Sequence, residues 1–403
     1  MNPWRSLSSL PKPLWVIFGT TLINRAGTMA LPFLVLYLTK HEGLTPSAAG
    51  LVLTAYGVGA LATGPYAGRL SDRIGPVRIM KASLFLSGGI LFLFPFLAGQ
   101  ALLLGVTVVW AVVSEAFRPA SMALVTEVVR PGDRKIAISV IRLAVNVGMS
   151  VGPAVGGFLL LVSYDLVFWI DGGTSVAAGF LLILMRWEGH GTPPAIHAPS
   201  GSLRDAFAAF KDRRLVYFLL AASPIFMIFF QHESTVALYM VRDLGMDEHN
   251  YGLLFPVNTL LIILLEIPLN VAMVQWPHRK ALMLGGFLVA AGFAATGLAW
   301  NFPSLVVTVV IWTFGEMILV PTCATFVADI SPENRRGEYM GIYQMSFSLS
   351  FALSGWIGTT VYELWGAGTL WSAVFVTGLI AVVMISRMQD VPARIQLEGG
   401  RNG

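Results

Sequence analysis

Two glutamates have the residue type and setting needed for proton or cation exchange. Glu115 and Glu316 each stand inside a long apolar run, and about 200 residues separate them. Burial in an apolar medium favours the neutral form of a carboxyl group, whereas a nearby guanidinium group favours its charged form. Arg118 follows Glu115 by three residues, which predicts a carboxylate that trades a proton for a cationic ligand. In the alternative interpretation, Glu115 and Arg118 form an i,i+3 ion pair that only stabilises their helix.

Other ionisable residues also interrupt apolar runs. Such groups cost ~2.5–3.5 kcal/mol at the centre of a bilayer, so they are usually functional or paired. Arg25 follows Asn24 and is expected to pair with an acid of another helix, with Glu233 and Glu316 as open alternatives. His232 is able to relay protons, unless its cluster with Glu233 lies at the outer surface. The candidate proton- and substrate-binding set is Glu115, Glu316, Arg25, Arg118, Asn24, His232 and Glu233.

The composition excludes a soluble enzyme. Of the 403 residues, 56% are hydrophobic and only 12% are charged, whereas soluble domains carry about 25% charged residues. The only cysteine is Cys323, so disulfides and cysteine-based metal sites are excluded. No Gly-Lys-Ser/Thr phosphate loop and no metal-ligand spacing occurs, so we expect neither ATP nor a metal nor another cofactor. The chain lacks a nucleophile–base set as well, and we expect a membrane protein that is not an enzyme.

The apolar runs predict an all-α polytopic membrane protein with twelve transmembrane helices. A spanning helix needs about 20 apolar residues. The N-terminal segment has no cleavable signal, and the first run is expected to remain as a span. Early in the sixth run, Asp171 is expected at the outer interface. The runs fall at about 14–38, 47–67, 77–98, 100–126, 136–161, 165–186, 215–240, 250–274, 280–299, 303–328, 337–361 and 366–386.

The basic residues predict the orientation. Twelve spans place both termini on the same side, and 21 of the 26 Lys and Arg residues then fall on that side. Only Lys40 and Arg242 fall on the other side. By the positive-inside rule, both termini are cytoplasmic, in the cytoplasmic membrane of a bacterium. The net charge of +4 therefore indicates orientation, and we expect the lipid bilayer but no nucleic acid as a partner.

The chain divides into two repeated halves. Residues 1–187 are predicted to form an N-terminal six-helix bundle, and residues 215–403 a C-terminal bundle with a short cytoplasmic tail. Between them, residues 188–214 begin with a Pro/Gly/Ser-rich stretch and end with an amphipathic one, which predicts a cytoplasmic linker with an interfacial helix. The segment 36–50 aligns with 238–252, and 130–135 aligns with 331–336, at nearly one offset. Two such halves are typical of transporters with a site near the membrane midplane.

A short charged loop, GRLSDRIGPVRIMK (68–81), lies between the second and third runs. Its pattern resembles the signature of the major facilitator superfamily between membrane helices 2 and 3. The resemblance implies a latch in which an aspartate sits at a helix N-terminus, where it gains ~0.3–1 kcal/mol, and basic residues pair with an acid at the end of helix 4. The latch residues implied are Gly68, Asp72, Arg73, Gly75, Arg78 and Glu127.

The fifth run carries GMSVGPAVGG (148–157), with small residues every four positions. Glycines at this spacing let a neighbouring helix approach closely, and a proline permits bending. Helix packing alone is one interpretation. The pattern also resembles the antiporter signature of the superfamily's proton-driven drug exporters, which implies export. Its residues are Gly148, Gly152, Pro153, Gly156 and Gly157.

Together these features predict a secondary active transporter of the major facilitator fold, with two pseudo-symmetric six-helix bundles. The resemblance favours a monomeric proton-coupled antiporter of the multidrug efflux type, which exports lipophilic or cationic small molecules by alternating access. A facilitator or proton symporter for a polar metabolite or organic anion remains an alternative, because three arginines interrupt the spans. A membrane receptor or assembly partner without transport is the alternative of another class.

Overall fold

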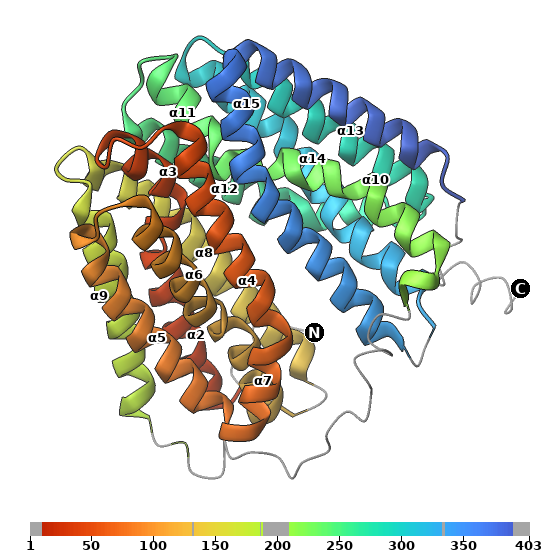
Figure 1. The fold of residues 1–403 in the computed structure, drawn as a ribbon. Helices are drawn as coiled ribbons and strands as arrows, with labels where there is room; N and C mark the ends of the chain where they lie inside the picture. Colours follow the sequence, from red (N-terminus) through yellow and green to blue (C-terminus); the bar gives the residue numbers. More distant parts are fainter. Residues whose placement is uncertain (1–9, 131–132, 186, 188–208, 333–334, 390–403) are drawn as a thin grey trace, which may run out of the picture. The chain divides into compact units, whose positions relative to one another are not determined.

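The protein is described by a computed structural model that covers residues 10–130, 133–185, 187, 209–332 and 335–389 (Figure 1). All regular structure in these residues is helical. Eleven helical segments are long and apolar enough to cross a membrane. The last of them, α15 (Arg336–Ser386), contains 51 residues and is interrupted at Gly366. A helix of that length measures about 77 Å, more than twice the ~30 Å hydrocarbon core, so its two parts form separate spans. The predicted all-α polytopic fold is confirmed.

The residues form two compact units, which are described separately. Unit 1 comprises residues 1–198 together with 247–259, and unit 2 comprises residues 199–246 together with 260–403. The predicted linker with its interfacial helix falls mainly on residues 188–208, which lie outside the described residues. Between residues 209 and 212, the backbone N–H of Ala209 donates to the carboxylate of Glu338 at 2.7 Å within unit 2.

Unit 1 contains the first six spans, and two of these consist of two helices each. Span 1 is broken between α2 and α3, whereas α6 and α7 of span 4 meet at Ala116 without leaving the helical conformation. The helices of unit 1 are α2 (Lys12–Gly27), α3 (Ala30–Lys40), α4 (Pro46–Ile74), α5 (Pro76–Leu93), α6 (Gln100–Glu115), α7 (Phe117–Val128), α8 (Arg134–Leu160) and α9 (Asp165–Leu184), with the first half of α12 (Glu248–Ala272).

Unit 2 repeats this plan with a similar break in its first span. That span is divided into α10, a short 3-10 segment η4 and α11. The helices of unit 2 are α10 (Arg213–Phe229), η4 (Phe230–Glu233), α11 (Thr235–Arg242), the second half of α12, α13 (His278–Thr296), α14 (Phe302–Ile330) and α15.

A glycine makes the turn between spans 2 and 3. Gly75 has φ +93°, a conformation that residues with a Cβ rarely adopt. Residues 68–74 continue α4, and α5 begins at Pro76. The segment predicted as a charged loop is therefore mostly helical, because the single positive-φ residue completes the turn.

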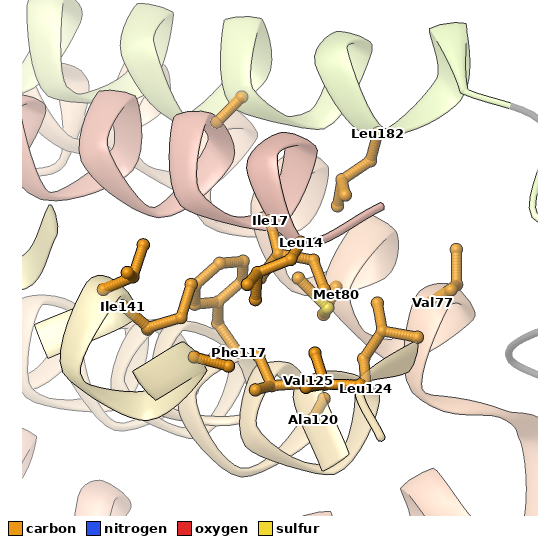
Figure 2. Packing of buried hydrophobic residues seen from close by; sticks show 14 of the residues in the cluster. Leu14, Ile17, Val77, Met80, Phe117, Ala120, Leu124, Val125, Ile141 and Leu182 are labelled. Atoms are coloured by element: carbon orange, nitrogen blue, oxygen red, sulfur yellow. The ribbon is translucent and has the colours of Figure 1, made fainter. Parts of the chain in front are cut away.

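An apolar core closes one end of unit 1 (Figure 2). The first turns of α2, α5 and α8 and the last turns of α9 meet α7 there. Leu14 and Ile17 are fully buried, and Phe117 is nearly so. In a membrane, lipid solvates apolar side chains as well as protein does, so close fit rather than exclusion of water holds such a core together. This core holds the ends of the helices that also carry the polar groups of the candidate site.

Candidate functional site

A carboxylate holds the break in span 1. Helix α2 ends at Gly27, and α3 begins at Ala30. The first N–H groups of a helix have no partner within the helix and need an external acceptor. The Oδ2 atom of Asp171, on α9, accepts hydrogen bonds from the backbone N–H groups of Met29 and Ala30, both at 3.1 Å. Asp171 is only 5% exposed, so its side chain lies inside unit 1; its expected depth at the outer interface of the membrane stays a prediction.

The same face of α9 holds the end of α2. The amide group of Asn24 donates to the hydroxyl of Ser175 at 3.2 Å, and the hydroxyl of Thr174 donates to the backbone carbonyl of Asp171 at 2.9 Å. The hydroxyl of Thr28, in the break itself, donates to the carbonyl of Asn24 at 3.1 Å. The break is therefore a defined structure with satisfied hydrogen bonds.

The predicted small-residue stripe of α8 packs against this break. A Cβ atom on Gly148 would lie 2.5 Å from the Cβ of Arg25, and one on Gly152 would lie 2.7 Å from the carbonyl oxygen of Thr28. Farther along, a Cβ on Gly156 would lie 2.8 Å from that of Met29. The spacing thus allows α8 to approach the irregular backbone of span 1, as helix packing predicts.

A small polar pocket lies beside the break, within unit 1. Its cavity volume is about 40 Å³, room for roughly three water molecules. Helices α2, α4, α5, α6 and α9 supply its walls. The lining includes Asn24, Arg25, Tyr56, Ser83, Ser87, Ser114, Glu115, Asp171 and Ser175.

Glu115 ends α6 and is bound from α4. The phenol of Tyr56 donates to Oε1 of Glu115 at 3.0 Å and lies 3.0 Å from the hydroxyl of Ser114. The ring of Tyr56 is 5% exposed and packs edge-to-face on Trp110, with centroids 4.9 Å apart. This packing fixes the phenol against the carboxylate.

Arg25 is the cation of the pocket. It lines the same cavity as Glu115 and lies within electrostatic range of Asp171 and Tyr56. Its Nε atom is buried and has no hydrogen-bond partner among the described residues. The structure therefore brings Arg25 next to acids of α6 and α9, whereas the sequence suggested Glu233 or Glu316.

Arg118 occupies a different environment from Glu115. Arg118 stands exposed on the first turn of α7, and the backbone between α6 and α7 stays helical at Ala116. Within the described part of the chain, Glu115 is held by Tyr56, and no ion pair to Arg118 is found. The i,i+3 ion pair that the sequence suggested is therefore not formed, because Glu115 bonds to α4 instead.

Unit 2 gathers the other predicted residues. His232 and Glu233 lie in η4, with Nε2 of His232 3.4 Å from Oε1 of Glu233. Nδ1 of His232 donates to the carbonyl of Phe229 at 2.7 Å, and its ring stacks on Trp312. Glu316, on α14, lies within electrostatic range of His232. Oε2 of Glu233 is buried without a hydrogen-bond partner among the described residues.

The latch residues lie around the end of α4. Arg73, Arg78 and Glu127 are exposed, and Gly75 forms the turn. The side chain of Asp72 and the surroundings of Gly68 lie outside what the structure describes. No group of three His, Cys, Asp or Glu residues that could hold a metal ion occurs among the described residues.

Sequence reasoning did not assign Tyr56, Asp171, Ser175 or Gln231 to a site. Asp171 carried a signal, since it is an acid in an apolar run. A lone tyrosine or serine in a span is compatible with plain packing, so these residues needed the tertiary structure.

Comparison with known proteins places the chain in context. The model of the Major Facilitator Superfamily matches residues 16–239 and 233–400. An uncharacterised MFS-type transporter of Bacillus subtilis, YqjV, is 27% identical over 91% of this chain and 90% of its own length. A Na(+), Li(+), K(+)/H(+) antiporter of Planococcus maritimus is 23% identical, over 85% and 89%. The multidrug resistance protein MdtH of Cronobacter sakazakii is 24% identical, over 67% of each chain.

A solved structure supports the fold. The crystal structure of the nucleoside transporter NupG superposes with a TM-score of 0.84 and covers 94% of this chain and 99% of its own. At 13% identity, this likeness concerns the fold alone.

Proposed function

The chain belongs to the Major Facilitator Superfamily and is a multi-pass secondary transporter of that type, and we propose that it is a proton-coupled antiporter. In this proposal it exports lipophilic or cationic small molecules by alternating access between two six-helix bundles, residues 1–187 and 215–403. It works as a monomer in the cytoplasmic membrane of a bacterium, with both termini inside. The basic residues on the side of the termini support this orientation.

One observation carries the proposal: Glu115, Tyr56 and Arg25 line one small polar pocket inside the first unit. A carboxylate in such a place is costly unless it is paired or takes up a proton. Its carboxylate accepts a hydrogen bond from the Tyr56 phenol, and Arg25 lines the same cavity. In the proposed cycle, Glu115 binds either a proton or the charge of the substrate, so arrival of one releases the other.

Unit 2 is proposed to supply the second proton group. Nε2 of His232 lies 3.4 Å from Oε1 of Glu233, and the ring is within electrostatic range of Glu316. His232 can therefore pass a proton between the two acids. The aromatic residues around it, Phe229, Phe230 and Trp312, provide an apolar surface. Such surfaces suit lipophilic ligands.

The two motifs that resemble signatures of the superfamily keep the roles that the resemblance implies. Asp72, Arg73, Arg78 and Glu127 are proposed to form a latch that stabilises one conformation. The glycines of α8 are proposed to support export, and their close fit against span 1 agrees with a part in its movement.

The relatives support two substrate classes. MdtH is named a multidrug resistance protein, which agrees with lipophilic or cationic cargo. The Planococcus relative is named a Na(+), Li(+), K(+)/H(+) antiporter, so exchange of a monovalent cation for a proton is the second candidate. The name of the Planococcus relative includes the proton as the exchanged ion, which agrees with the role proposed for Glu115.

The test uses purified protein in vesicles with an imposed proton gradient. Release of protons is followed by a pH-sensitive dye while a lipophilic cationic dye, Na⁺, K⁺ or an organic anion is added in separate arms. Tyr56→Phe removes the hydroxyl that binds Glu115, and Tyr217→Phe removes a hydroxyl that binds only the carbonyl of Met384, at 2.9 Å. We expect slower exchange for the first variant and normal exchange for the second.

If the parent protein exchanges none of the cations for protons, the proposal of proton-coupled antiport is wrong. Exchange driven by the organic anion alone would replace it by anion transport. Normal exchange in Glu115→Gln and also in Glu316→Gln would remove these acids from the mechanism.

A further inference from the structure

We propose that Asp171 is a positioning residue of the transport cycle: its charged carboxylate holds the break in span 1, and its protonation releases that break. The inference rests on the proposed transport function, because it assigns a moving part to it. Asp171 belongs to α9 and lies outside both sequence motifs. The proposed function assigns the proton of this pocket to Glu115 and gives Asp171 no role.

The break needs an acceptor at one particular place. The backbone between Gly27 and Ala30 leaves the helical path, so the N–H groups at the start of α3 point away from the α2 carbonyls. Lipid cannot accept these hydrogen bonds, and an unsatisfied N–H group within a span is expensive. Asp171 accepts two of these N–H groups with one oxygen, both at 3.1 Å. Loss of this acceptor therefore affects two hydrogen bonds at once.

The charge of the carboxylate strengthens these bonds. Hydrogen bonds to an ionised acceptor are roughly twice as strong as neutral ones, and an anion at a helix N-terminus is stabilised by the helix dipole. A protonated Asp171 loses both contributions while its shape stays the same. The break is then held by weaker bonds: neutral ones to the carboxyl group of Asp171, the backbone bond from Thr28 to Arg25, and those of Asn24 to Ser175 and of Thr28 to Asn24.

The groups that face Asp171 connect it to the pocket. They are Arg25 on α2, Tyr56 on α4 and Glu115 on α6, and α5 contributes only the hydroxyl groups of Ser83 and Ser87. Arg25 stands two residues before the end of α2 and is within electrostatic range of Asp171. A change in the charge of Asp171 therefore alters both the break and the position of the guanidinium group beside Glu115.

The packing of α8 limits how span 1 can respond. Because Gly148 and Gly152 leave no free space against Arg25 and Thr28, α2 cannot move toward α8. The open direction is the small cavity, which Leu31 at the start of α3 also lines. Release of the break is therefore expected to move the start of α3 relative to this cavity and to change access to Leu31.

The experiment measures that access without a transport assay. Cys323, the only cysteine, is replaced by alanine, and Leu31→Cys is introduced. In purified protein, the reaction rate of the new thiol with a water-soluble thiol reagent is divided at each pH by the rate of a free thiol. Between about pH 5 and about pH 9, we expect the normalised rate to rise about tenfold toward low pH, which corresponds to ~1.4 kcal/mol.

Asp171→Asn imitates the protonated residue and should give the fast rate at every pH. Ser175→Ala, one turn along α9, removes the bond to Asn24 but leaves the carboxylate, and it should keep the pH response. Asp171→Ala removes both charge and acceptor; should it fail to fold, Asp171→Asn still decides, because it has the same shape. A pH response in Asp171→Asn equal to that of the parent, or a parent without any response, would overturn the inference.

The result is separable from the proposed function. If the parent shows the expected labelling but exchanges no substrate for protons in vesicles, the transport proposal fails and the role proposed for Asp171 stands. If exchange is observed and its pH profile is the same in Asp171→Asn as in the parent, the role proposed for Asp171 fails and the transport proposal stands.

Discussion

The broken first spans of the two units solve the same structural problem with different chemistry. In unit 1, the charged side chain of Asp171 reaches in from α9 and accepts two N–H groups of span 1. In unit 2, the neutral amide of Gln231 lies within the break itself. Its Nε2 donates to the carbonyls of Met227 and Ser354, at 3.2 and 3.3 Å, and its Oε1 accepts from Thr235 at 2.7 Å.

Small residues pack against both breaks at equivalent positions of the repeat. Gly156 of α8 packs against Met29 in unit 1, and Gly358, 202 positions later, packs against Gln231 in unit 2. Ser354 stands 202 positions after Gly152 and supplies the carbonyl that Gln231 binds. Duplication therefore kept the small residues that let two helices approach, while the polar groups at the breaks diverged. The group that bonds the first break is thus a carboxylate that can take up a proton, whereas the group that bonds the second break is an amide that cannot, although His232 and Glu233 lie beside it in η4.

The largest expected effect concerns the two glutamates. Glu115→Gln should slow proton-driven exchange about 100-fold, because general acid–base groups contribute ~10²–10⁴ in rate. Glu316→Gln should slow it about tenfold, because His232 and Glu233 remain nearby to carry protons. The measurement is the initial rate of proton release in vesicles. Equal losses in both variants would mean that the two units respond to protons alike.

A charge placed in the second break should be poorly tolerated. Gln231→Glu removes the amide N–H groups that donate to the carbonyls of Met227 and Ser354. In its charged form the new carboxylate has no proton to donate, so these carbonyl groups would face it without a hydrogen bond. We expect the free energy of unfolding to fall by about 2 kcal/mol. Thermal unfolding in detergent measures this loss, with Gln231→Met as the uncharged control, which should lose less. A stability unaffected by Gln231→Glu would show that the hydrogen bonds of this amide are not needed to hold the second break.

The close approach of α8 to the first break should be sensitive to a single methyl group. The Cβ in Gly152→Ala would meet backbone oxygen atoms of Thr28, Ala26 and Arg25 at 2.7–3.2 Å, and backbone cannot rotate away. We expect a loss of about 1.5 kcal/mol. Gly105→Ala, on α6, meets nothing within 4 Å and should be neutral or stabilising by ~0.5–1 kcal/mol.

In unit 2 the matching variant is Gly358→Ala. It faces the side chain of Gln231, which is able to shift at the cost of its hydrogen bonds. Its loss should therefore be smaller than that of Gly152→Ala when unfolding temperatures are compared. The reverse order would show that the neutral break is the more rigid of the two.

The smallest effect is expected outside the spans. Burial tends to raise the pKa of Asp212, but hydrogen bonds from Arg214 and Tyr339 outweigh it and hold the pKa below its ordinary value of 3.8. A lowered pKa in the folded state stabilises the protein above that ordinary value, and this contribution is lost as the pH falls through the folded-state pKa. Arg214 is exposed, so the contribution should stay below ~1 kcal/mol.

Asp212→Asn should therefore lower the unfolding temperature slightly at neutral pH and leave it unchanged below about pH 3. The comparison is made with the parent across the same acid range. A difference that persists at the lowest pH would assign the role of Asp212 to its hydrogen bonds and not to its charge.

The repeat also preserved an acid at the end of the fourth span of each unit. Asp329 of α14 stands 202 positions after Glu127 and lies 3.0 Å from Nε2 of His278 on α13. In unit 2 this acid therefore contacts a histidine at the start of α13.

The sequence alone determined the membrane-spanning fold and its duplication. The thickness of the bilayer sets the length of each apolar run, so the spans can be found along the sequence alone. The repeat can also be found in this way, because loop residues recur at nearly one offset and this does not depend on how the helices pack. It also identified most ionisable groups, including Glu115 and Arg25, because each interrupts an apolar run.

Only the tertiary structure decided which of these groups meet. Glu115 bonds to Tyr56 while Arg118 stays exposed, and the rotation of α9 brings Asp171 to span 1 and into the pocket of Arg25. In spans that are apolar on nearly every face, hydrophobic periodicity does not encode helix rotation, so contacts between distant helices depend on small-residue packing and on hydrogen bonds to irregular backbone. Those contacts appear only when the helices are assembled.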